Sequence, residues 1–552
     1  MAGESITLAP NPVLEYTLLS SSGSPSNPVP EPAAARSRPK LMRSGFIVSV
    51  MTMLSRILGL VRDIVFAHTI GAQAGADAFF LAFKIPNFFR RLFSEGAFAQ
   101  AFVPVLAEYR EKGSKAAVQQ LIDRVSGCLG ITLLGLTLAV MIASPAVTLV
   151  FAPGFSDDPA KFTLAQEMLR ITFPYLLLIS LTGFAGAILN SYDHFAAPAF
   201  TPVLLNICLI TAAIWLSPQF ETPVFALAWG VLCAGMVQLA FQIPFLWRLR
   251  LLPKPKVDFK DEGVRKILLL MAPAIFGVSV SQINLLLDTV LASFLPTGSI
   301  SWLYYSDRLV ELPLGTIAIA IGTVILPSLS RQHVKEDLSQ FSKTMDWALR
   351  CILLIAVPAT LALFILAEPI LFTLFGYGQT TERDIIMASY SLKAYSIGLL
   401  AFMLIKVLAP GYFARQDTKT PVKIGIIAML SNMVLNLVFV IPLHFYWQLG
   451  HVGLALATSL SAFINAGLLY RGLRKQGIYR PESQWWLYLR RVFIANVLLA
   501  LGLWVLVNYL PSWSGLVVNE RIAYTAIACV LGVIVYVVVL LVSGLRPRHL
   551  KH

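Results

Sequence analysis

Long apolar segments recur along the chain from Phe46 to Leu545, and short polar connections separate them. Most are about 20 residues or longer, the length that an α-helix needs to cross the hydrocarbon core of a bilayer. The pattern therefore predicts an all-α polytopic membrane protein with about fourteen transmembrane helices, of which charges interrupt the second and the eighth. The predicted spans are 46–68, 78–104, 125–151, 166–190, 199–217, 223–247, 267–293, 301–329, 347–375, 386–412, 421–442, 451–471, 490–510 and 522–545.

Residues 1–40 differ from the rest of the chain, because they are rich in Ser, Pro and Ala and contain no apolar run of membrane length. They also lack the basic start and apolar stretch of a signal peptide. Such a composition cannot bury enough apolar surface to fold. We therefore expect a disordered cytoplasmic tail.

The composition excludes several classes of protein. Of the 552 residues, 57% are hydrophobic and 13% are charged, about half of the ~25% charged residues typical of soluble domains. Mean hydropathy is +0.73. A soluble enzyme, a disordered scaffold and a nucleic-acid-binding protein are therefore disfavoured. The five cysteines lie in apolar runs without a CxxC pair, and the seven histidines lack metal-ligand spacing, so we expect neither a metal nor a cofactor.

The excess of lysine and arginine, which gives the chain a net charge of +14, is distributed unevenly among the connections between the predicted spans. The tail and alternate connections carry 30 lysines and arginines, whereas the intervening connections carry only Lys161, Arg383 and Arg521. Cytoplasmic connections of membrane proteins are enriched in Lys and Arg. Both termini are therefore predicted to lie in the cytoplasm, and the charge does not call for nucleic acid.

Sequence pairs separated by about 220 residues indicate an internal repeat. Arg62-Asp63 matches Leu287-Asp288, Phe79-Phe80 matches Tyr304-Tyr305, and Thr201-Pro202-Val203 matches Thr420-Pro421-Val422. A duplicated six-helix unit would form a parallel repeat, as in many transporters. The predicted domains are a tail (1–40), an N-lobe (43–250), a C-lobe (251–480) and a final helix pair with the C-terminus (481–552), and the long connection 247–266 separates the lobes.

Ten cations fall within the predicted spans. They are Arg56, Arg62, Lys84, Arg90, Arg91, Arg170, Arg308, Arg350, Lys393 and Lys406. At the bilayer centre each would cost about 2.5–3.5 kcal/mol. Those near helix ends, such as Arg170 and Arg350, can reach the headgroups. The others must line a wet cavity or pair with acids.

Helical spacing groups these charges with other polar residues. In the eighth span Ser301, Tyr305, Arg308 and Glu311 share a face, and in the first span Ser55 and Arg62 share one. Pure ion pairing between helices would explain some of them. An excess of arginine suits an anion better, above all a phosphate, because the planar guanidinium binds phosphate oxygens in pairs.

Three stretches of the chain resemble a known family. They are SRILGLVRDIVFAHTIGAQAGADAFFLAFKIPNFFRRLFSEGAFAQAFVPVLAEY (55–109), SWLYYSDRLVELPLGTIAIAIGTVILPSLS (301–330) and KVLAPGYFARQDTKTPVK (406–423). They are similar to signatures of the lipid II flippase family MurJ (also MviN), which belongs to the multidrug/oligosaccharidyl-lipid/polysaccharide exporter superfamily. The resemblance covers about residues 43–546, and residues 1–40 depart from it.

The resemblance implies fourteen helices in two lobes around a cationic cavity, with an apolar groove for a polyprenyl tail on helices 13 and 14. It implies lipid II as the substrate, alternating access, and a place in the bacterial inner membrane, where the chain would serve peptidoglycan synthesis. The family's diphosphate contacts fall on Arg56, Arg62, Arg90 and Arg308. Its cavity and gate positions fall on Ser55, Asp77, Asn87, Glu95, Ser301, Asp307, Glu311 and Lys406.

Other functions stay open at this stage. A related flippase for O-antigen-type lipid-linked oligosaccharides, or a cation-coupled drug exporter, would share the fold, although a drug exporter should carry acids in its cavity. A membrane scaffold of the cell-wall machinery is the alternative without transport. A membrane glycosyltransferase would need a catalytic loop, but the largest outer connection offers only Asp157 and Asp158. Because no GxxxxGK[ST] motif occurs, we expect the membrane potential, rather than ATP, to drive transport.

Overall fold

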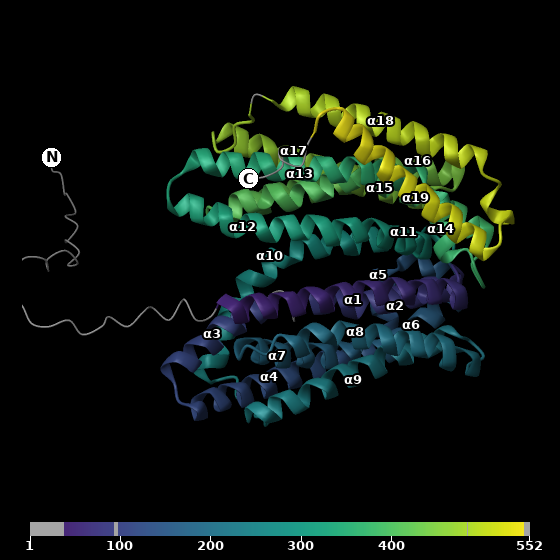
Figure 1. Cartoon of the computed structure of the whole chain (residues 1–552). Coiled ribbons are helices and arrows are strands. Elements are labelled where there is room, and N and C mark those ends of the chain that lie inside the picture. The colour runs from purple at the N-terminus through teal and green to yellow at the C-terminus, as the bar shows by residue number, and fades with distance from the viewer. Residues whose placement is uncertain (1–37, 93–97, 483, 546–552) are drawn as a thin grey trace, which may run out of the picture. The chain divides into compact units, whose positions relative to one another are not determined.

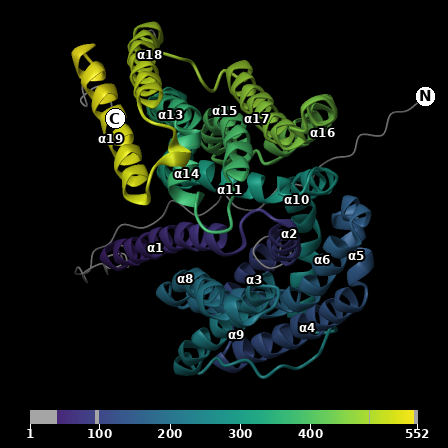
Figure 2. The same cartoon turned by 90° about the vertical axis from the view of Figure 1, so that its right-hand side faces the viewer.

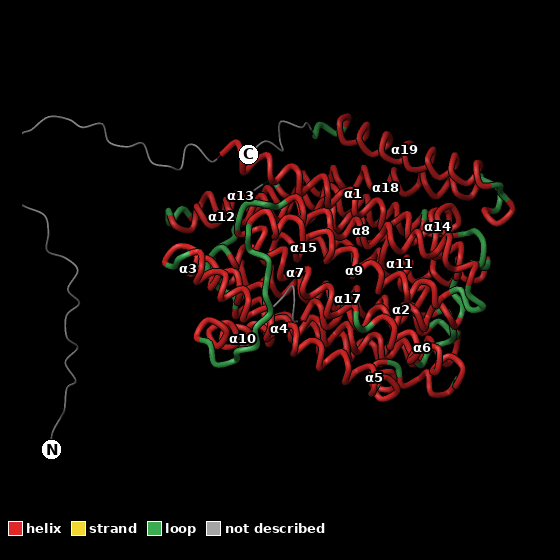
Figure 3. The backbone as a smooth tube through the Cα atoms, turned by 90° about the horizontal axis from the view of Figure 1, so that it is seen from below, coloured by secondary structure: helices red, strands yellow, loops and turns green. Residues whose placement is uncertain are grey.

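The computed structural model describes residues 38–92, 98–482 and 484–545. Within these residues the regular structure is helical and no strand is present (Figure 3). The helices are α1 (Arg38–Ile70), α2 (Ala74–Phe89), α3 (Ala99–Lys112), α4 (Lys115–Ile142), α5 (Ser144–Phe151), α6 (Pro159–Thr172), α7 (Tyr175–Ser191), α8 (Ala196–Thr211), α9 (Val224–Leu249), α10 (Glu262–Ser293), α11 (Ser299–Pro313), α12 (Ile319–Val334), α13 (Leu338–Ile365), α14 (Ala367–Phe375), α15 (Glu382–Phe413), α16 (Lys419–Trp447), α17 (Gly450–Lys475), α18 (Trp485–Tyr509) and α19 (Val518–Val542).

Eleven helical segments of the described part are long and apolar enough to cross a membrane. The three predicted spans outside this set, 46–68, 78–104 and 267–293, lie in α1, in α2 with α3, and in α10. The all-α polytopic class is confirmed. The number of about fourteen spans stays a prediction.

Several predicted spans differ in detail from the helices of the structure. Within the span 78–104, α2 ends at Phe89, residues 90–92 are π-helical and α3 begins at Ala99, whereas residues 93–97 lie outside the described part. Residues Arg38–Lys40, predicted as part of the tail, belong to α1, whereas residues 1–37 lie outside the described part. The eighth span is α11 and α12, joined by a π-helical turn, Leu314–Ala318.

The helices between residues 47 and 475 pack in two groups, which are well separated in colour in Figure 1. In the N-half, formed by α1 (from Ile47) to α9, α9 packs on α7 and α8, and α2 packs on α6. In the C-half, formed by α10 to α17, α15 packs on α13 and α17. α10 also contacts α3 and α4 of the N-half. The predicted lobes and their boundaries stay a prediction.

The last two helices form a pair outside both groups. α18 and α19 pack on each other, α18 packs on α13, and α19 packs on α14 (Figure 2). On α13, buried Asp346 accepts hydrogen bonds from Tyr479 and Trp485. It also forms an ion pair with Arg350, whose Nε lies 2.8 Å from Asp346 Oδ2. Arg350 is therefore held by a carboxylate, and its position relative to the headgroups stays a prediction. This cluster fastens the start of α18 to the C-half.

The connection between the halves is bound to the N-half. The backbone N–H of Lys254 donates to the Asp123 carboxylate at 2.8 Å, and that of Lys256 donates to the Asp123 carbonyl at 2.9 Å. Asp123 is buried on α4. A Cβ at Gly127 of α4 would overlap the backbone of Lys256. We call this end of the bundle, which carries residues 250–261, the linker end.

The opposite end carries the turn between α1 and α2, and we call it the Gly71 end. Gly71 has a φ of +61°, which favours glycine. The starts of α11 and α15, from the C-half, lie against this turn: the Tyr305 hydroxyl donates to the Gly71 carbonyl at 2.9 Å, and the Gln379 N–H donates to the His68 carbonyl at 3.0 Å. The halves therefore touch directly at the Gly71 end.

Candidate functional site

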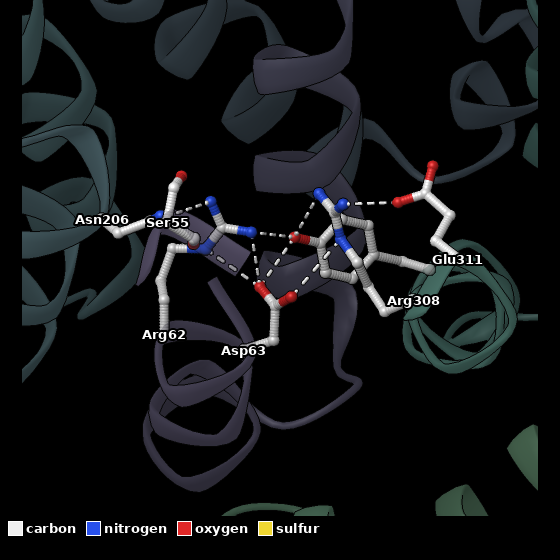
Figure 4. A network of polar contacts seen from close by, with 7 residues as sticks. Ser55, Arg62, Asp63, Asn206, Arg308 and Glu311 are labelled. Atoms are coloured by element: carbon white, nitrogen blue, oxygen red, sulfur yellow. Dashed lines mark hydrogen bonds and ion pairs between the residues drawn. The ribbon is translucent and has the colours of Figure 1, made fainter. Parts of the chain in front are cut away.

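A buried carboxylate joins arginines of the two halves (Figure 4). Asp63 on α1 is 1% exposed. Its Oδ1 accepts hydrogen bonds from Arg62 Nε at 2.9 Å and Nη2 at 2.7 Å. Its Oδ2 lies 3.3 Å from Nε of Arg308 on α11. One carboxylate thus holds Arg62 from the N-half and Arg308 from the C-half, two of the four arginines that the resemblance implies as diphosphate contacts.

Tyr304 completes the link between these arginines. Its hydroxyl donates to Asp63 Oδ1 at 2.9 Å and accepts from Arg62 Nη2 at 2.9 Å and from Arg308 Nη2 at 3.4 Å. The Tyr304 ring stacks on Phe80 of α2, with 4.0 Å between the ring centroids. The neighbouring Tyr305, which helical spacing places on the face of Arg308, is buried and donates to the Gly71 carbonyl.

The charges of this network balance. Arg308 Nη1 donates to Glu311 at 2.8 Å, so two guanidinium groups face two carboxylates. Asp63 and Arg62 are buried, whereas the side chains of Arg308 and Glu311 are 35% and 45% exposed. The C-half side of the network is therefore the accessible side. An incoming dianion could exchange with carboxylates there, because arginine binds phosphate and carboxylate by the same paired geometry.

The other two predicted arginines lie in different contacts. The Arg56 guanidinium lies against Gly315 in the π-helical turn of the C-half, where a Cβ would overlap it. Arg90 Nε donates to Asn87 Oδ1 at 3.1 Å, and Asn87 Nδ2 donates to the Phe83 carbonyl at 2.8 Å. Both arginines are partly buried. Asn87 therefore orients Arg90, as a polar cavity position should.

The remaining predicted positions differ in exposure. Asp307 on α11 and Lys406 on α15 are exposed, and Ser55 is partly buried on α1. Glu95 lies outside the described residues. No group of three or more His, Cys, Asp or Glu side chains that could hold a metal ion occurs among the described residues.

Asp77 and Ser301, both predicted gate positions, form a contact at the Gly71 end. Asp77 on α2 is 1% exposed and accepts from the Ser301 hydroxyl at 2.7 Å, the Ser301 N–H at 3.0 Å and the Gly298 N–H at 2.8 Å. It also pairs with Lys161 at 2.9 Å. Asp77 thus caps the first turn of α11 from the other half, where an anion is favoured.

The same end contains the reverse contact. The C-half segment between α14 and α15 donates to carbonyls in the last turn of α1, from Thr380 Oγ1 to the Ala67 oxygen at 2.7 Å and from the Gln379 N–H to the His68 oxygen. Gly378, at a φ of +64°, lies so close that a Cβ would overlap the His68 carbonyl. Each half therefore satisfies helix-terminal groups of the other.

Sequence reasoning missed three residues of these contacts. Tyr304 lies four residues before Arg308, so helical spacing could have found it. Asn206 on α8, which bonds Arg62 and the Ser55 carbonyl, is an intramembrane polar residue, which is by itself a signal of function. Lys161 was placed in an outer connection, but it is 5% exposed and paired. Asp158, predicted as a turn residue, is exposed and caps α6.

A family model described as "Lipid II flippase MurJ" matches residues 66–524. The chain belongs to the MurJ family. A relative from Vibrio cholerae named probable lipid II flippase MurJ is 52% identical over 520 residues, which cover 93% of this chain and 98% of the relative. The lipid II flippase MurJ of Burkholderia cenocepacia is 42% identical and covers 93% of this chain and 99% of its own length. The MurJ family is one of transporters, so the prediction of a transporter rather than an enzyme is confirmed.

Solved structures agree with this assignment. The chain is similar to a structure described as "Lipid II flippase MurJ, inward closed conformation", with a TM-score of 0.75, 27% identity, and coverage of 90% of this chain and 98% of that chain. An inward-facing multidrug resistance MATE transporter of the MOP superfamily shares the fold at a TM-score of 0.61 and 14% identity, covering 78% of this chain and 98% of its own. The predicted superfamily fold is thus confirmed.

Proposed function

We propose that the chain is a lipid II flippase, which moves the undecaprenyl-diphosphate-linked peptidoglycan precursor from the inner to the outer leaflet of the bacterial cytoplasmic membrane. Membership of the MurJ family and the names of its relatives support this substrate. The product serves cell-wall synthesis outside the membrane. The observation within the molecule that carries the proposal is the network in which Arg62 and Arg308, from the two halves, share Asp63.

The diphosphate binds to the arginines of a central cavity between the halves. Arg308 lies on the accessible side of the network and is the first to exchange its carboxylate partners for phosphate oxygens. Arg62 follows, and Arg56 and Arg90 surround the headgroup. Each guanidinium keeps an anionic partner through the exchange, and Glu311, the carboxylate that Arg308 gives up first, is 45% exposed, so that water can solvate it. The polyprenyl tail lies along α18 and α19, whose apolar side chains, such as Phe493 and Val533, are exposed.

Transport proceeds by alternating access. The Gly71 end is the outer side in this proposal and is closed here by the contacts of Asp77, Ser301 and Gly378 with the opposite half. Opening it breaks hydrogen bonds at helix ends that water can replace, so the two states can lie close in free energy.

The membrane potential drives the cycle, without ATP or another cofactor. An outward-moving diphosphate of charge about −2 gains ~2.3 kcal/mol per charge per 100 mV when the inside is negative. The emptied cationic cavity returns inward down the same field. Translocation should therefore fall when the potential is collapsed at a constant pH gradient. Undiminished translocation would remove this driving force and favour ion coupling.

The positive balance of the predicted inner connections supports cytoplasmic termini. In this orientation the linker end faces the cytoplasm. The partners are lipid II and the surrounding membrane lipids, with cell-wall synthesis complexes as protein partners that would receive the product outside. The proposal includes no nucleic acid.

The proposal is tested by lipid II translocation in vesicles that contain the purified protein. Arg308→Gln should abolish translocation, whereas Arg308→Lys should retain a fraction of it, because lysine keeps the charge but not the paired geometry. Arg331→Gln, an exposed arginine of α12, is the matched control and should behave as wild type. If the protein is a scaffold of the cell-wall machinery, purified protein will not move lipid II and Arg308→Gln will support growth.

A further inference from the structure

Asn206 connects two turns of α1 with one carboxamide, as Figure 4 shows. Its Oδ1 accepts from Arg62 Nη1 at 3.0 Å, and its Nδ2 donates to the Ser55 carbonyl at 2.9 Å. The side chain is 5% exposed on α8. Only one orientation of the amide serves both contacts, since arginine only donates and a carbonyl only accepts.

We propose that Asn206 is a positioning residue for Arg62, and through it for the diphosphate contact that the proposed function gives to Arg62. The inference rests on that function. Asn206 itself does not touch the substrate in this account. Arg62 of α1 supplies the positive charge. Contacts within α1 do not by themselves determine the rotation of its guanidinium group, and Asn206 of α8 fixes that rotation.

The donors of Arg62 show why one more partner matters. Nε and Nη2 both point to Asp63 Oδ1, and Nη2 also reaches the Tyr304 hydroxyl. These partners lie on the side of the guanidinium that faces the C-half. Nη1 has Asn206 as its hydrogen-bond partner, from the N-half. When Tyr304 and Arg308 of α11 separate from Arg62 and Asp63 of α1 as the halves move, Asn206 stays with α1 and keeps the guanidinium plane in place.

The second bond explains why asparagine, and not another acceptor, suits this position. Nδ2 is anchored on the Ser55 carbonyl two turns earlier on α1, so the amide cannot rotate to follow Arg62. Gly59 lies between these turns, and its ideal Cβ position is 3.8 Å from Asn206 Nδ2. An aspartate would lose the anchor, because it only accepts. It would also place a fixed negative charge on Arg62 in competition with a phosphate.

The test is a double-mutant cycle on translocation in vesicles, with the rate measured against the mole fraction of lipid II. Asn206→Leu should raise the half-saturating mole fraction about tenfold, the effect expected from losing one hydrogen bond to a charged group. In an Arg62→Lys background the same change should add less than about twofold, because the group that it orients is already lost. Asn206→Asp, which keeps the volume of the side chain, should raise the half-saturating mole fraction at least as much as Asn206→Leu.

Gln238→Leu is the matched control, because Gln238 is buried on α9 and its carboxamide donates to the Thr201 carbonyl of α8 rather than to a residue of the Arg62 network. It should leave half-saturation unchanged. If Asn206→Leu raises the half-saturating mole fraction equally in the wild-type and the Arg62→Lys backgrounds, the positioning role is overturned. It is also overturned if neither Asn206 variant changes the half-saturating mole fraction. If Arg62→Lys has the same half-saturating mole fraction as the wild type, Arg62 does not bind the diphosphate. That outcome would contradict the proposed function of Arg62 rather than the positioning role of Asn206.

Discussion

The two ends of the helix bundle hold the halves together in different ways. At the Gly71 end, Asp77 caps α11 and the Gln379 and Thr380 donors cap α1, so the contacts are hydrogen bonds between separate segments. At the linker end, residues 250–261 join the halves covalently, and Asp123 binds this connection to α4 of the N-half. The contacts at the first end are ones that water can replace, whereas at the second end the backbone itself keeps the halves connected.

The largest effect is expected from Gly378→Ala. A Cβ there would overlap the His68 carbonyl, and the φ of +64° strains any other residue. A backbone carbonyl cannot move away from the new Cβ as a flexible side chain can, so the overlap should cost ~1–3 kcal/mol. The equilibrium constant for closing the Gly71 end should therefore fall by up to about a hundredfold. Translocation should fall in proportion. The distance between spin labels at Gln73 and Glu382, measured after replacement of the native cysteines, should lengthen.

Gly477→Ala is the control for this variant. Gly477 has a φ of +70°, but its nearest neighbour to a Cβ, Arg480, is 4.0 Å away. It therefore carries the backbone strain without the overlap. Equal losses in the two glycine variants would show that strain, and not the contact between the halves, limits transport.

A smaller effect is expected from Asp77→Asn. The amide can still accept from Ser301, but it leaves the buried Lys161 without its carboxylate. Translocation should decrease about tenfold, consistent with ~1.5–3 kcal/mol for hydrogen bonds to charged groups. Asp158→Asn, the exposed cap of α6, should decrease it less than about twofold. If both variants transport equally, Asp77 does not hold the Gly71 end closed.

The linker end should respond in stability rather than in transport. Gly127→Ala would push the backbone of Lys256 away from α4 and should destabilise the protein by about 1–3 kcal/mol. Gly130→Ala, one turn further on the same helix, meets nothing within 4 Å and should not. Thermal unfolding in detergent measures both. A strong loss of translocation in correctly folded Gly127→Ala would mean that the contact between Lys256 and α4 is needed for transport as well as for stability.

The smallest effect concerns an ion pair on the surface of the linker end. Glu108 of α3 accepts from Lys266 of α10 at 2.5 Å, and this hydrogen bond lowers the pKa of Glu108 below its ordinary value. A lowered pKa in the folded state stabilises the protein above the ordinary carboxyl pKa, and the contribution disappears as the pH falls through the lowered value. At pH 7 the melting temperature of Glu108→Gln should be lower than that of the wild type by less than about 2 °C, and in acid the two melting temperatures should be equal. A constant difference across pH would exclude the ion pair as its cause.

Part of the site followed from the sequence because charge inside a membrane is costly. Arg62, Arg308 and Glu311 stood out for this reason, and they lie in one network. Their partners could not be derived in the same way. Asp63 was visible as an acid of the first span, but nothing in a linear sequence indicates that it pairs with Arg308, an arginine of the other half.

The gate positions show a similar division. Asp77 and Ser301 entered through resemblance, and they bond each other. Lys161, their third partner, looked like an ordinary loop cation, since burial by neighbouring helices leaves no mark on its local sequence. The tail, from residue 1 to 37, and Glu95 stay as predictions because they lie outside the described residues.

The sequence by itself determined the class of this protein, its apolar helices, its family and the set of charges that cannot face lipid. These properties depend on local composition and on the free energy of transfer of each segment, which act residue by residue. Only the tertiary structure decided which charges meet and which helix ends cap one another. Those outcomes depend on distances between segments far apart in the chain, and a hydrogen bond has strength only within about 3 Å of its partner.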